Sequence, residues 1–240
     1  MKKLPKILIG APTADVKQYC AEEWIQNVRE FIYPRFDIFL ADNSLTEDHI
    51  NFWREKGVEI ESANDNPKDS VIKRLTDSHN LVRKKALDGG YDFLLHLEVD
   101  VFPPPEVLIS LLSHLKPLVS VSYDIFDAEE REPVAIRTDT TFDGEETAII
   151  RGKYSQLWFD GSLKQTWTNG VGCALIHRSV LEQVEFRYVT DNNAFPDSWF
   201  AFDCAAKGIS HFIDTSMYAY HKNKDWRTYK DKFASNIFDN

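Results

Sequence analysis

The chain has 240 residues, and its 43% hydrophobic content is sufficient for one large domain with a sizeable core. Its 38 acidic and 28 basic residues give a net charge of -10, which argues against a general nucleic-acid binder, because such binding rests on a basic surface. Three widely spaced cysteines form neither a disulfide framework nor a zinc motif. With no apolar run of membrane-spanning length and no signal-peptide pattern, we expect a cytoplasmic protein.

The first half of the chain alternates short apolar runs with amphipathic stretches. Strands are predicted at residues 6–10, 36–41, 58–61, 92–97 and 118–122. Helices are predicted at residues 16–32, 47–56 with Thr46 as the cap, 70–87, and 106–115. This alternation predicts an α/β fold with a largely parallel central sheet.

The pattern changes after residue 122. Two apolar runs, 133–136 and 147–150, flank a polar stretch, which predicts a small antiparallel excursion that forms a lid. A segment rich in small residues then leads into a strand that ends at Ile176, and glycines there allow a ligand to approach the backbone closely. A helix is predicted from Asp197 to Lys207, and strand-like runs follow at 209–213 and 218–221.

Two carboxylates stand at the end of the strand over residues 92–97. Glu98 and Asp100 are two positions apart, and in an extended chain such residues point to the same side. Adjacent carboxylates repel each other unless a cation lies beside them. Oxygen ligands of this kind suit Mg²⁺ or Mn²⁺, the ions that accompany diphosphates. A solvated strand end with two unrelated acids is the competing interpretation.

Other polar residues also fall where predicted strands end. Thr13 follows the first strand, and Asp42 and Asn43 follow the second. Because ligands of open α/β sheets bind outside the carboxyl ends of the strands, we expect these side chains and the two carboxylates to share one site. Neither a dinucleotide-binding fingerprint nor a P-loop follows the first strand, which disfavours a nicotinamide-dependent oxidoreductase and a P-loop kinase.

The order of these parts resembles the GT-A glycosyltransferases, nearest to the inverting family 2 type, from Lys6 to about His221. The resemblance implies the GT-A fold, a Rossmann-like architecture of nucleotide-diphospho-sugar transferases, in a single catalytic domain over residues 1–240. Its expected parts are a nucleotide-binding half at 1–122, an inserted hairpin or lid at 123–166, an acceptor half at 167–221 and a C-terminal tail at 222–240.

The resemblance also implies roles for individual residues. Glu98-Val99-Asp100 stands at the acidic metal motif, with Glu in place of the first Asp, and His221 stands at a late histidine ligand. Donor contacts are implied for Ala11, Pro12, Thr13, Asp42, Asn43, Asn80, Glu98 and Val99. Acceptor contacts are expected at Trp167, Gly170, Gly172 and Trp199. Asp197 is implied as the catalytic base, although Pro196 replaces a preceding acid.

Each of these residues also has a purely structural interpretation. Asp197 is a good helix cap, His221 could be a packed histidine, and Asn80 could lie on a helix surface. The tryptophans could be core residues, since aromatic side chains most often are. His96 lies inside an apolar strand, so we expect a hydrogen-bonded core histidine.

The implied activity is transfer of a sugar from a nucleoside diphosphate donor to an acceptor hydroxyl, with inversion and with Mn²⁺ or Mg²⁺. UDP is favoured over GDP, and the acceptor, whether glycan, lipid, small molecule or modified nucleic acid, is open. A sugar-nucleotide pyrophosphorylase is disfavoured, because the first strand is not followed by a glycine-rich basic loop. Two further functions remain compatible with the sequence: an inactive nucleotide-sugar-binding module, and a glycosyltransferase of modified nucleic acid, which the basic and aromatic tail suggests.

Overall fold

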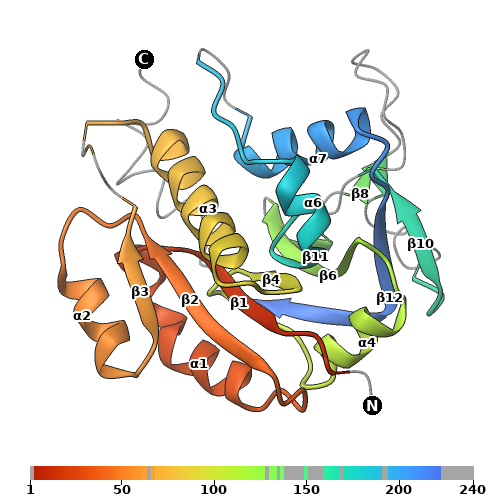
Figure 1. Ribbon diagram of the computed structural model, residues 1–240, viewed down its shortest axis with the longest axis horizontal. Helices are drawn as coiled ribbons and strands as arrows, with labels where there is room; N and C mark the ends of the chain where they lie inside the picture. The colour runs from red at the N-terminus through yellow and green to blue at the C-terminus, as the bar shows by residue number, and fades with distance from the viewer. Residues whose placement is uncertain are drawn as a thin grey trace.

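The computed structural model describes residues 3–63, 66, 68–127, 130–133, 136–137, 149–150, 159–167, 170–190 and 194–222. One sheet runs through the centre of the molecule (Figure 1). Its strands are β1 (Ile7–Thr13), β2 (Phe36–Asp42), β3 (Glu59–Ser62), β4 (Phe93–Leu97), β5 (Val101–Phe102), β6 (Leu118–Asp127), β7 (Glu130–Pro133), β10 (Leu163–Thr166), β11 (Cys173–His177) and β12 (His211–His221). A separate antiparallel pair joins β8 (Ile136–Arg137) to β9 (Ile149–Ile150).

The strand order confirms the predicted α/β architecture. Along the sheet the order is β3-β2-β1-β4-β11-β6-β12-β10. Strands β3, β2, β1, β4, β6 and β12 run in one direction, and β11 and β10 run in the other. The short strands β5 and β7 pair antiparallel with β12 and β6. The sheet is therefore mostly parallel, and the expected antiparallel excursion is present after residue 123.

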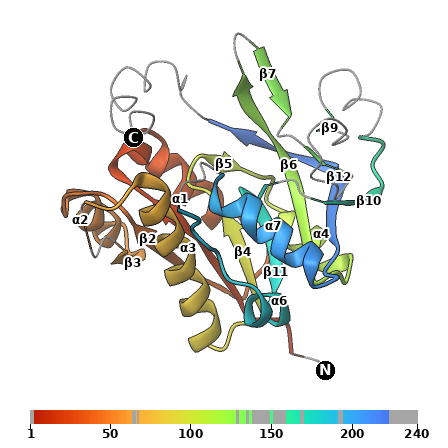
Figure 2. The ribbon, with the colours of Figure 1, turned by 90° about the horizontal axis from the view of Figure 1, so that it is seen from above.

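Helices cover both faces of the sheet. They are η1 (Asp15–Cys20), α1 (Ala21–Arg29), α2 (Asp48–Glu55), α3 (Val71–Asp88), α4 (Val107–Ser113), α6 (Arg178–Gln183) and α7 (Pro196–Ala206). In Figure 1, α1, α2 and α4 lie below the sheet, and α3, α6 and α7 lie above it; Figure 2 shows the second group from above. None of the helices in the described ranges is long and apolar enough to cross a membrane.

The two faces of the sheet bury two separate hydrophobic clusters. Along β1, Ile7 and Ile9 belong to the cluster between the sheet and α1, whereas Leu8 belongs to the cluster between the sheet and α3. This is the alternation of side chains that a strand requires. Helix α3 approaches β1 closely at Gly10, where an added Cβ would lie 2.9 Å from Cγ1 of Val82. This close packing places α3 directly over the strands whose ends form the site.

The structure departs from the predicted elements at several places. The expected helix at 16–32 starts as the 3-10 helix η1, and only Ala21–Arg29 is α-helical. Thr46 is not the cap of α2, because Glu47 holds that position without a side-chain cap. The runs at 209–213 and 218–221 form one strand, β12, which continues through an irregularity between Asp214 and Tyr218 because it pairs with β6 on both sides of it.

Candidate functional site

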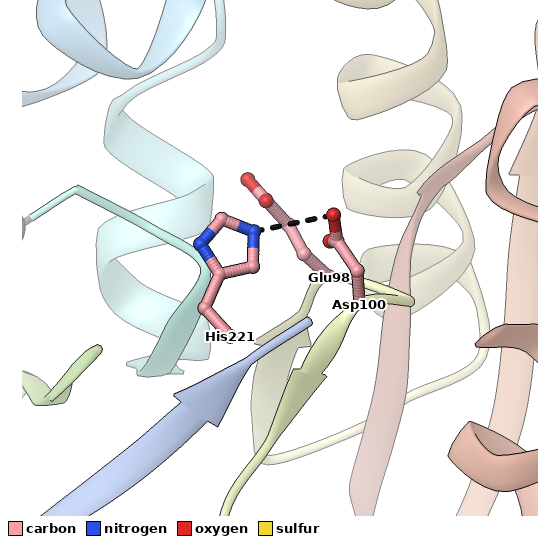
Figure 3. Close-up of side chains that lie close together, drawn as sticks. All are labelled: Glu98, Asp100 and His221. Atoms are coloured by element: carbon pink, nitrogen blue, oxygen red, sulfur yellow. Dashed lines mark ion pairs between the residues drawn. The ribbon is translucent and has the colours of Figure 1, made fainter. Parts of the chain in front are cut away.

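Two acidic side chains and one imidazole converge at the carboxyl edge of the sheet. Glu98 and Asp100 lie in the turn between β4 and β5, and His221 is the last residue of β12. Strand β5 pairs with β12 so that Val101 lies opposite His221, which brings the end of β12 to the turn. One ligand atom from each of the three side chains lies within 4.8 Å of the others, and Figure 3 shows the side chains pointing toward one another.

The geometry of the acidic pair differs from the expected continuous strand. Strand β4 ends at Leu97, and the N–H of Val101 donates to the carbonyl of Glu98 at 3.0 Å, which closes a turn. The N–H of Glu98 also donates to the carbonyl of Gly172 at 2.9 Å. A turn anchored to a neighbouring segment, rather than strand alternation, therefore brings the two carboxylates together.

Asp100 is fully buried among cationic and hydroxyl partners. Its Oδ2 contacts the ammonium of Lys17, lies 3.2 Å from Nε2 of His221 and accepts a long hydrogen bond of 3.5 Å from the hydroxyl of Tyr19. Burial alone would raise the pKa of Asp100, but Lys17 and His221 hold it well below its usual range. Its Oδ1 is buried and has no hydrogen-bond partner within the described ranges.

Glu98 has the opposite electrostatic environment. Burial, and after it the adjacent Asp100, raise the pKa of Glu98, and the carboxylate of Asp197 adds to this effect. Lys17 and His221 oppose the shift without reversing it. The pair therefore carries unbalanced negative charge whenever Glu98 is ionised, and an additional cation would stabilise it.

The residues of this cluster fit a divalent metal ion. Two carboxylates and an imidazole are a donor set that suits Mn²⁺, whereas Mg²⁺ prefers oxygen ligands alone. Oδ1 of Asp100, which has no partner among the described residues, is the kind of buried acceptor that a bound cation would satisfy. We therefore regard Glu98, Asp100 and His221 as a candidate Mn²⁺ site.

A second polar cluster lies at the ends of β1 and β2. Thr13 and Asp42 are paired in register as the last residues of these strands. Asp42 is fully buried, and its Oδ1 accepts a hydrogen bond of 2.7 Å from the hydroxyl of Ser44. Its Oδ2 is also buried but has no partner in the described part of the chain. Burial raises the pKa of Asp42 to about 6.

A buried histidine network supports this second cluster. Trp53 Nε1–H donates to Nε2 of His49 at 2.9 Å, so that nitrogen is an acceptor, and the Thr13 hydroxyl lies 3.0 Å from it. Nδ1 of His49 then carries the proton and donates to Oε1 of Gln18 at 2.7 Å. Burial lowers the pKa of His49 to about 4, so the ring is neutral at physiological pH.

The remaining expected donor-binding residues occupy different surroundings. Ala11 and Pro12 lie within β1 itself, where Ala11 is fully buried, because the strand continues to Thr13. The N–H of Asn43 donates to the carbonyl of Thr13 at 2.9 Å. Val99, which stands between the two carboxylates in the sequence, is buried in the hydrophobic cluster between the sheet and α1.

Asn80 links α3 to the segment that precedes α7. Its Nδ2 donates to the carbonyl of Phe186 at 2.7 Å, and its Oδ1 accepts from the N–H of Phe186 at 3.0 Å. The amide retains one donor and one acceptor for another partner. The predicted core histidine is confirmed, because His96 is fully buried between Val171 O at 2.6 Å and His79 Nδ1 at 2.9 Å.

The glycine-rich segment packs against a buried tyrosine. The N–H of Gly172 donates to the hydroxyl of Tyr123 at 3.2 Å, and an added Cβ at Gly172 would lie 2.5 Å from Cζ of that ring. The Tyr123 ring also stands edge-on to the His221 ring, with centroids 5.4 Å apart. Gly170 has a φ of 70°, which favours glycine.

Asp197 lies in the first turn of α7 and is half-buried. Its Oδ1 accepts a hydrogen bond of 2.8 Å from the N–H of Ser198, and its charge acts on Glu98, so α7 presents this carboxylate to the same region. The two expected acceptor tryptophans have different surroundings. Trp167 is buried just after β10, and Trp199 is stacked against the guanidinium of Arg187, whose Cζ lies 4.1 Å from the ring centroid.

Three residues of the site are not predicted from the sequence: Lys17, His49 and Tyr123. Lys17 and His49 fall within predicted helices, and nothing in the helical pattern distinguishes a buried ion pair or a buried hydrogen bond from a surface position. Tyr123 stands at the start of the expected excursion. Lys17 could have been recognised from its position, because it closely follows the end of the first predicted strand, which carries other candidate residues.

Comparison with solved structures identifies proteins of the same fold. The chain is similar to residues 1–349 of TarS from S. aureus, solved in complex with UDP-GlcNAc, with a TM-score of 0.55 and 11% identity over 92% of this chain and 60% of that chain. It is also similar to the mannosyltransferase PcManGT from Pyrobaculum calidifontis, solved with GDP-Man and Mn²⁺, with a TM-score of 0.62 and 14% identity over 98% of this chain and 63% of that chain.

These comparisons confirm the GT-A glycosyltransferase fold that the sequence resemblance implies. The chain spans about three fifths of the two chains it is compared with, 60% of TarS 1–349 and 63% of PcManGT, and only 38% of the longer TarS chain. No protein-family model matches the chain, and no curated protein sequence matches it. At these sequence identities the structural similarity establishes the fold, whereas the function depends on the residues of the site.

Proposed function

We propose that this protein is a metal-dependent glycosyltransferase that moves a sugar from a nucleoside diphosphate donor to an acceptor hydroxyl with inversion. The observation that carries the proposal is that two polar clusters lie at the same edge of the sheet. Asp42 and Thr13 form one cluster, and Glu98, Asp100 and His221 form the other. A nucleoside diphosphate sugar needs both a base-binding and a cation-binding region, at the carboxyl edge where such folds bind ligands.

The Asp42 carboxylate supports a uridine nucleotide. One oxygen, Oδ1, already accepts from Ser44, whereas Oδ2 has no partner among the described residues and can accept from a base. Uracil presents one imide N–H between two carbonyls, which one carboxylate oxygen satisfies. Guanine presents two adjacent donors and would use both oxygens of a carboxylate. We therefore favour UDP over GDP as the donor nucleotide.

The residues of the second cluster would hold the divalent ion. Glu98, Asp100 and His221 supply the ligands, and a cation at this place offsets the negative charge that develops on the diphosphate leaving group. Burial of Asp100 strengthens such electrostatic contacts, because water that would screen them is excluded.

Asp197 is the group on α7 that would act on the acceptor. Its carboxylate would take the proton of the acceptor hydroxyl, whose oxygen then attacks the anomeric carbon from the face opposite the diphosphate. The bond from that carbon to the diphosphate breaks, so the configuration at the carbon is inverted. The first turn of α7 stabilises the ionised carboxylate but also lowers its basicity, so partial desolvation beside the acceptor would be needed for it to act as a base.

The proposal is tested by calorimetric titration of UDP and of GDP into the protein, with and without Mn²⁺. We expect micromolar binding of UDP that depends on Mn²⁺ and is lost in Asp100→Ala. The matched control is Asp92→Ala, which removes an exposed carboxylate just before β4 begins, at the opposite end of that strand. Binding that is unchanged in Asp100→Ala would contradict the metal site.

Two different outcomes would redirect the interpretation. Failure of both nucleotides to bind in the presence of Mn²⁺ would count against a glycosyltransferase altogether. Nucleotide binding that persists in Asp197→Asn, while the wild-type protein shows no turnover with any acceptor, would instead support an inactive nucleotide-sugar-binding module.

A further inference from the structure

The short helix η1 bridges the two clusters of the site. At the base-binding end, the N–H of Asp15 donates to the hydroxyl of Ser44 at 2.8 Å, and Gln18 accepts from His49 at 2.7 Å. At the metal-binding end, Lys17 pairs with Asp100, and the thiol of Cys20 donates to the carbonyl of Val99 at 3.4 Å. Because η1 contacts both clusters, a molecule that occupied both would follow a path close to this helix.

Lys17 places its ammonium group at the metal-binding end of this path. The ammonium contacts Oδ2 of Asp100, the same oxygen that lies 3.2 Å from Nε2 of His221. The Lys17 side chain is only 21% exposed and that of Asp100 is 0% exposed, so solvent screens this ion pair weakly. The ammonium therefore lies against one of the three side chains that would hold the divalent ion.

We propose that Lys17 is a displaceable counter-ion, which neutralises Asp100 until the donor binds and then moves its ammonium to the diphosphate. The inference rests on the proposed function, because it takes a nucleoside diphosphate as the ligand that crosses η1. Lys17 would then contact the substrate directly, and it would also determine the order in which the metal ion and the nucleotide bind.

Charge balance is the physical reason for this order. A divalent ion that binds alone has to share Asp100 with the ammonium or displace it from a largely buried position, and both cost free energy. A diphosphate brings several negative charges, so the ion and the ammonium can then be neutralised together. Lys17 should therefore oppose Mn²⁺ binding to the free protein and favour nucleotide binding.

The test is Lys17→Met, studied by binding rather than by activity. Mn²⁺ binding to the nucleotide-free protein is followed by electron paramagnetic resonance, and UDP binding at saturating Mn²⁺ by calorimetry. We expect Mn²⁺ to bind about tenfold more tightly than to the wild type, and UDP at saturating Mn²⁺ about tenfold more weakly. The two affinities should change in opposite directions, whereas general damage to the site would weaken the binding of both Mn²⁺ and UDP.

The matched control is Lys222→Met. Lys222 follows the ligand His221 directly, but its ammonium pairs with Glu23 at 2.6 Å, and only its backbone N–H contacts Asp100, at the carbonyl. The control removes the same charge near the site, and both affinities should stay within about twofold of the wild type. Mn²⁺ affinity that is unchanged or reduced in Lys17→Met would overturn the proposal.

Lys17→Arg keeps the test decisive if Lys17→Met fails to fold. A guanidinium can hold a carboxylate with two parallel hydrogen bonds, so Mn²⁺ should bind the free protein as weakly as in the wild type or more weakly. Tighter Mn²⁺ binding in Lys17→Arg would contradict the proposal. Failure of the proposed function would look different, because wild-type protein would then bind no nucleotide even with Mn²⁺.

Discussion

Glu98 and Asp100 are two residues apart, yet their surroundings push their pKa values in opposite directions. Lys17 and His221 surround Asp100 and keep it ionised, whereas Glu98 has burial and the negative charge of Asp100 acting against ionisation. Two neighbouring groups with divergent pKa values are characteristic of functional sites. Here the divergence follows from which carboxylate the cations contact, and this is a property of individual side chains.

At the residue scale, the proposed base is tested by Asp197→Asn. The amide keeps the shape of the side chain but cannot take the proton from the hydroxyl of the acceptor substrate. We therefore expect kcat to fall by about 10²–10⁴. Turnover is measured as UDP released from a UDP-sugar in the presence of acceptor, and UDP affinity with Mn²⁺ should be unchanged. Asp203→Asn is the control, because Asp203 lies on the same helix and pairs with Arg187 at 2.7 Å. Full activity of Asp197→Asn would exclude this residue as the base.

Asp42 gives a prediction about pH. Its pKa is raised to about 6 by burial, so the carboxylate is ionised above that pH and protonated below it. The imide N–H of uracil needs a hydrogen-bond acceptor, and protonation of the Asp42 carboxylate would take away the oxygen that serves as one. Uridine affinity should therefore fall as the pH drops from about 7.5 to about 5. Uridine is the probe because it has no phosphate to titrate, and nuclear magnetic resonance titration measures the affinity.

The matched variant for this pH dependence is Asp42→Asn, which has no proton to gain. Its uridine affinity should be the same at both pH values, even if it is lower than in the wild type. A wild-type affinity that does not change over this pH range would show that Asp42 does not contact the base. Tighter binding of guanosine than of uridine would reverse the choice of nucleotide.

At the scale of elements, strand β12 and the glycine-rich segment determine the shape of the metal cluster. β12 reaches the acidic turn because it pairs with β6 and then with β5. The carbonyl of Gly172 fixes the N–H of Glu98, and the ring of Tyr123 on β6 packs against both Gly172 and His221. These three elements hold the side chains of the cluster within a few ångströms of one another.

Gly172→Ala tests this packing. The added methyl group would lie 2.5 Å from Cζ of the buried Tyr123 ring, and the ring cannot move without displacing its neighbours. We expect the free energy of unfolding, measured with urea, to fall by about 1–3 kcal/mol. In Gly172→Ala/Tyr123→Ala the clash is absent, so the combined loss should be smaller than the sum of the two single losses. Strict additivity would contradict the contact.

At the scale of the whole molecule, the site joins parts that lie far apart in the chain. The proposed base-binding cluster comes from β1, β2 and α2, whereas the candidate metal cluster needs the last residue of β12. A nucleotide bound with its metal ion would contact both parts, and it would therefore stabilise the folded state as a unit.

Thermal unfolding measures this coupling. At 100 times the Kd, a ligand stabilises the fold by about 2.7 kcal/mol, which for a chain of this size raises Tm by about 5–10 °C. We expect this increase with UDP and Mn²⁺ together and a much smaller one with UDP alone. In Asp100→Ala, Mn²⁺ should add nothing to the effect of UDP. An equal increase with and without Mn²⁺ in the wild type would argue against a shared site.

Much of the fold could be predicted because it depends on local patterns. Short apolar runs indicated β1, β2, β4 and β6, and the glycine pair after residue 88 marked the end of α3. The errors lie where tertiary contacts override local preference. Residues 15–20 form a 3-10 helix that contacts both clusters, and β12 extends beyond its predicted length because of its pairing with β6 and β5.

The sequence by itself determined the acids at the strand ends, the order of the elements and, through its resemblance, the family of folds. Those features are local, because a strand followed by Glu98-Val99-Asp100 or by Asp42 can be recognised within a few residues. Only the tertiary structure showed how His221 reaches the acidic turn, which the resemblance had implied, and only it showed that Lys17 neutralises Asp100 and that His49 supports Thr13. These contacts join residues 36 to 123 positions apart, and their partners are selected by strand pairing and burial rather than by any pattern along the chain.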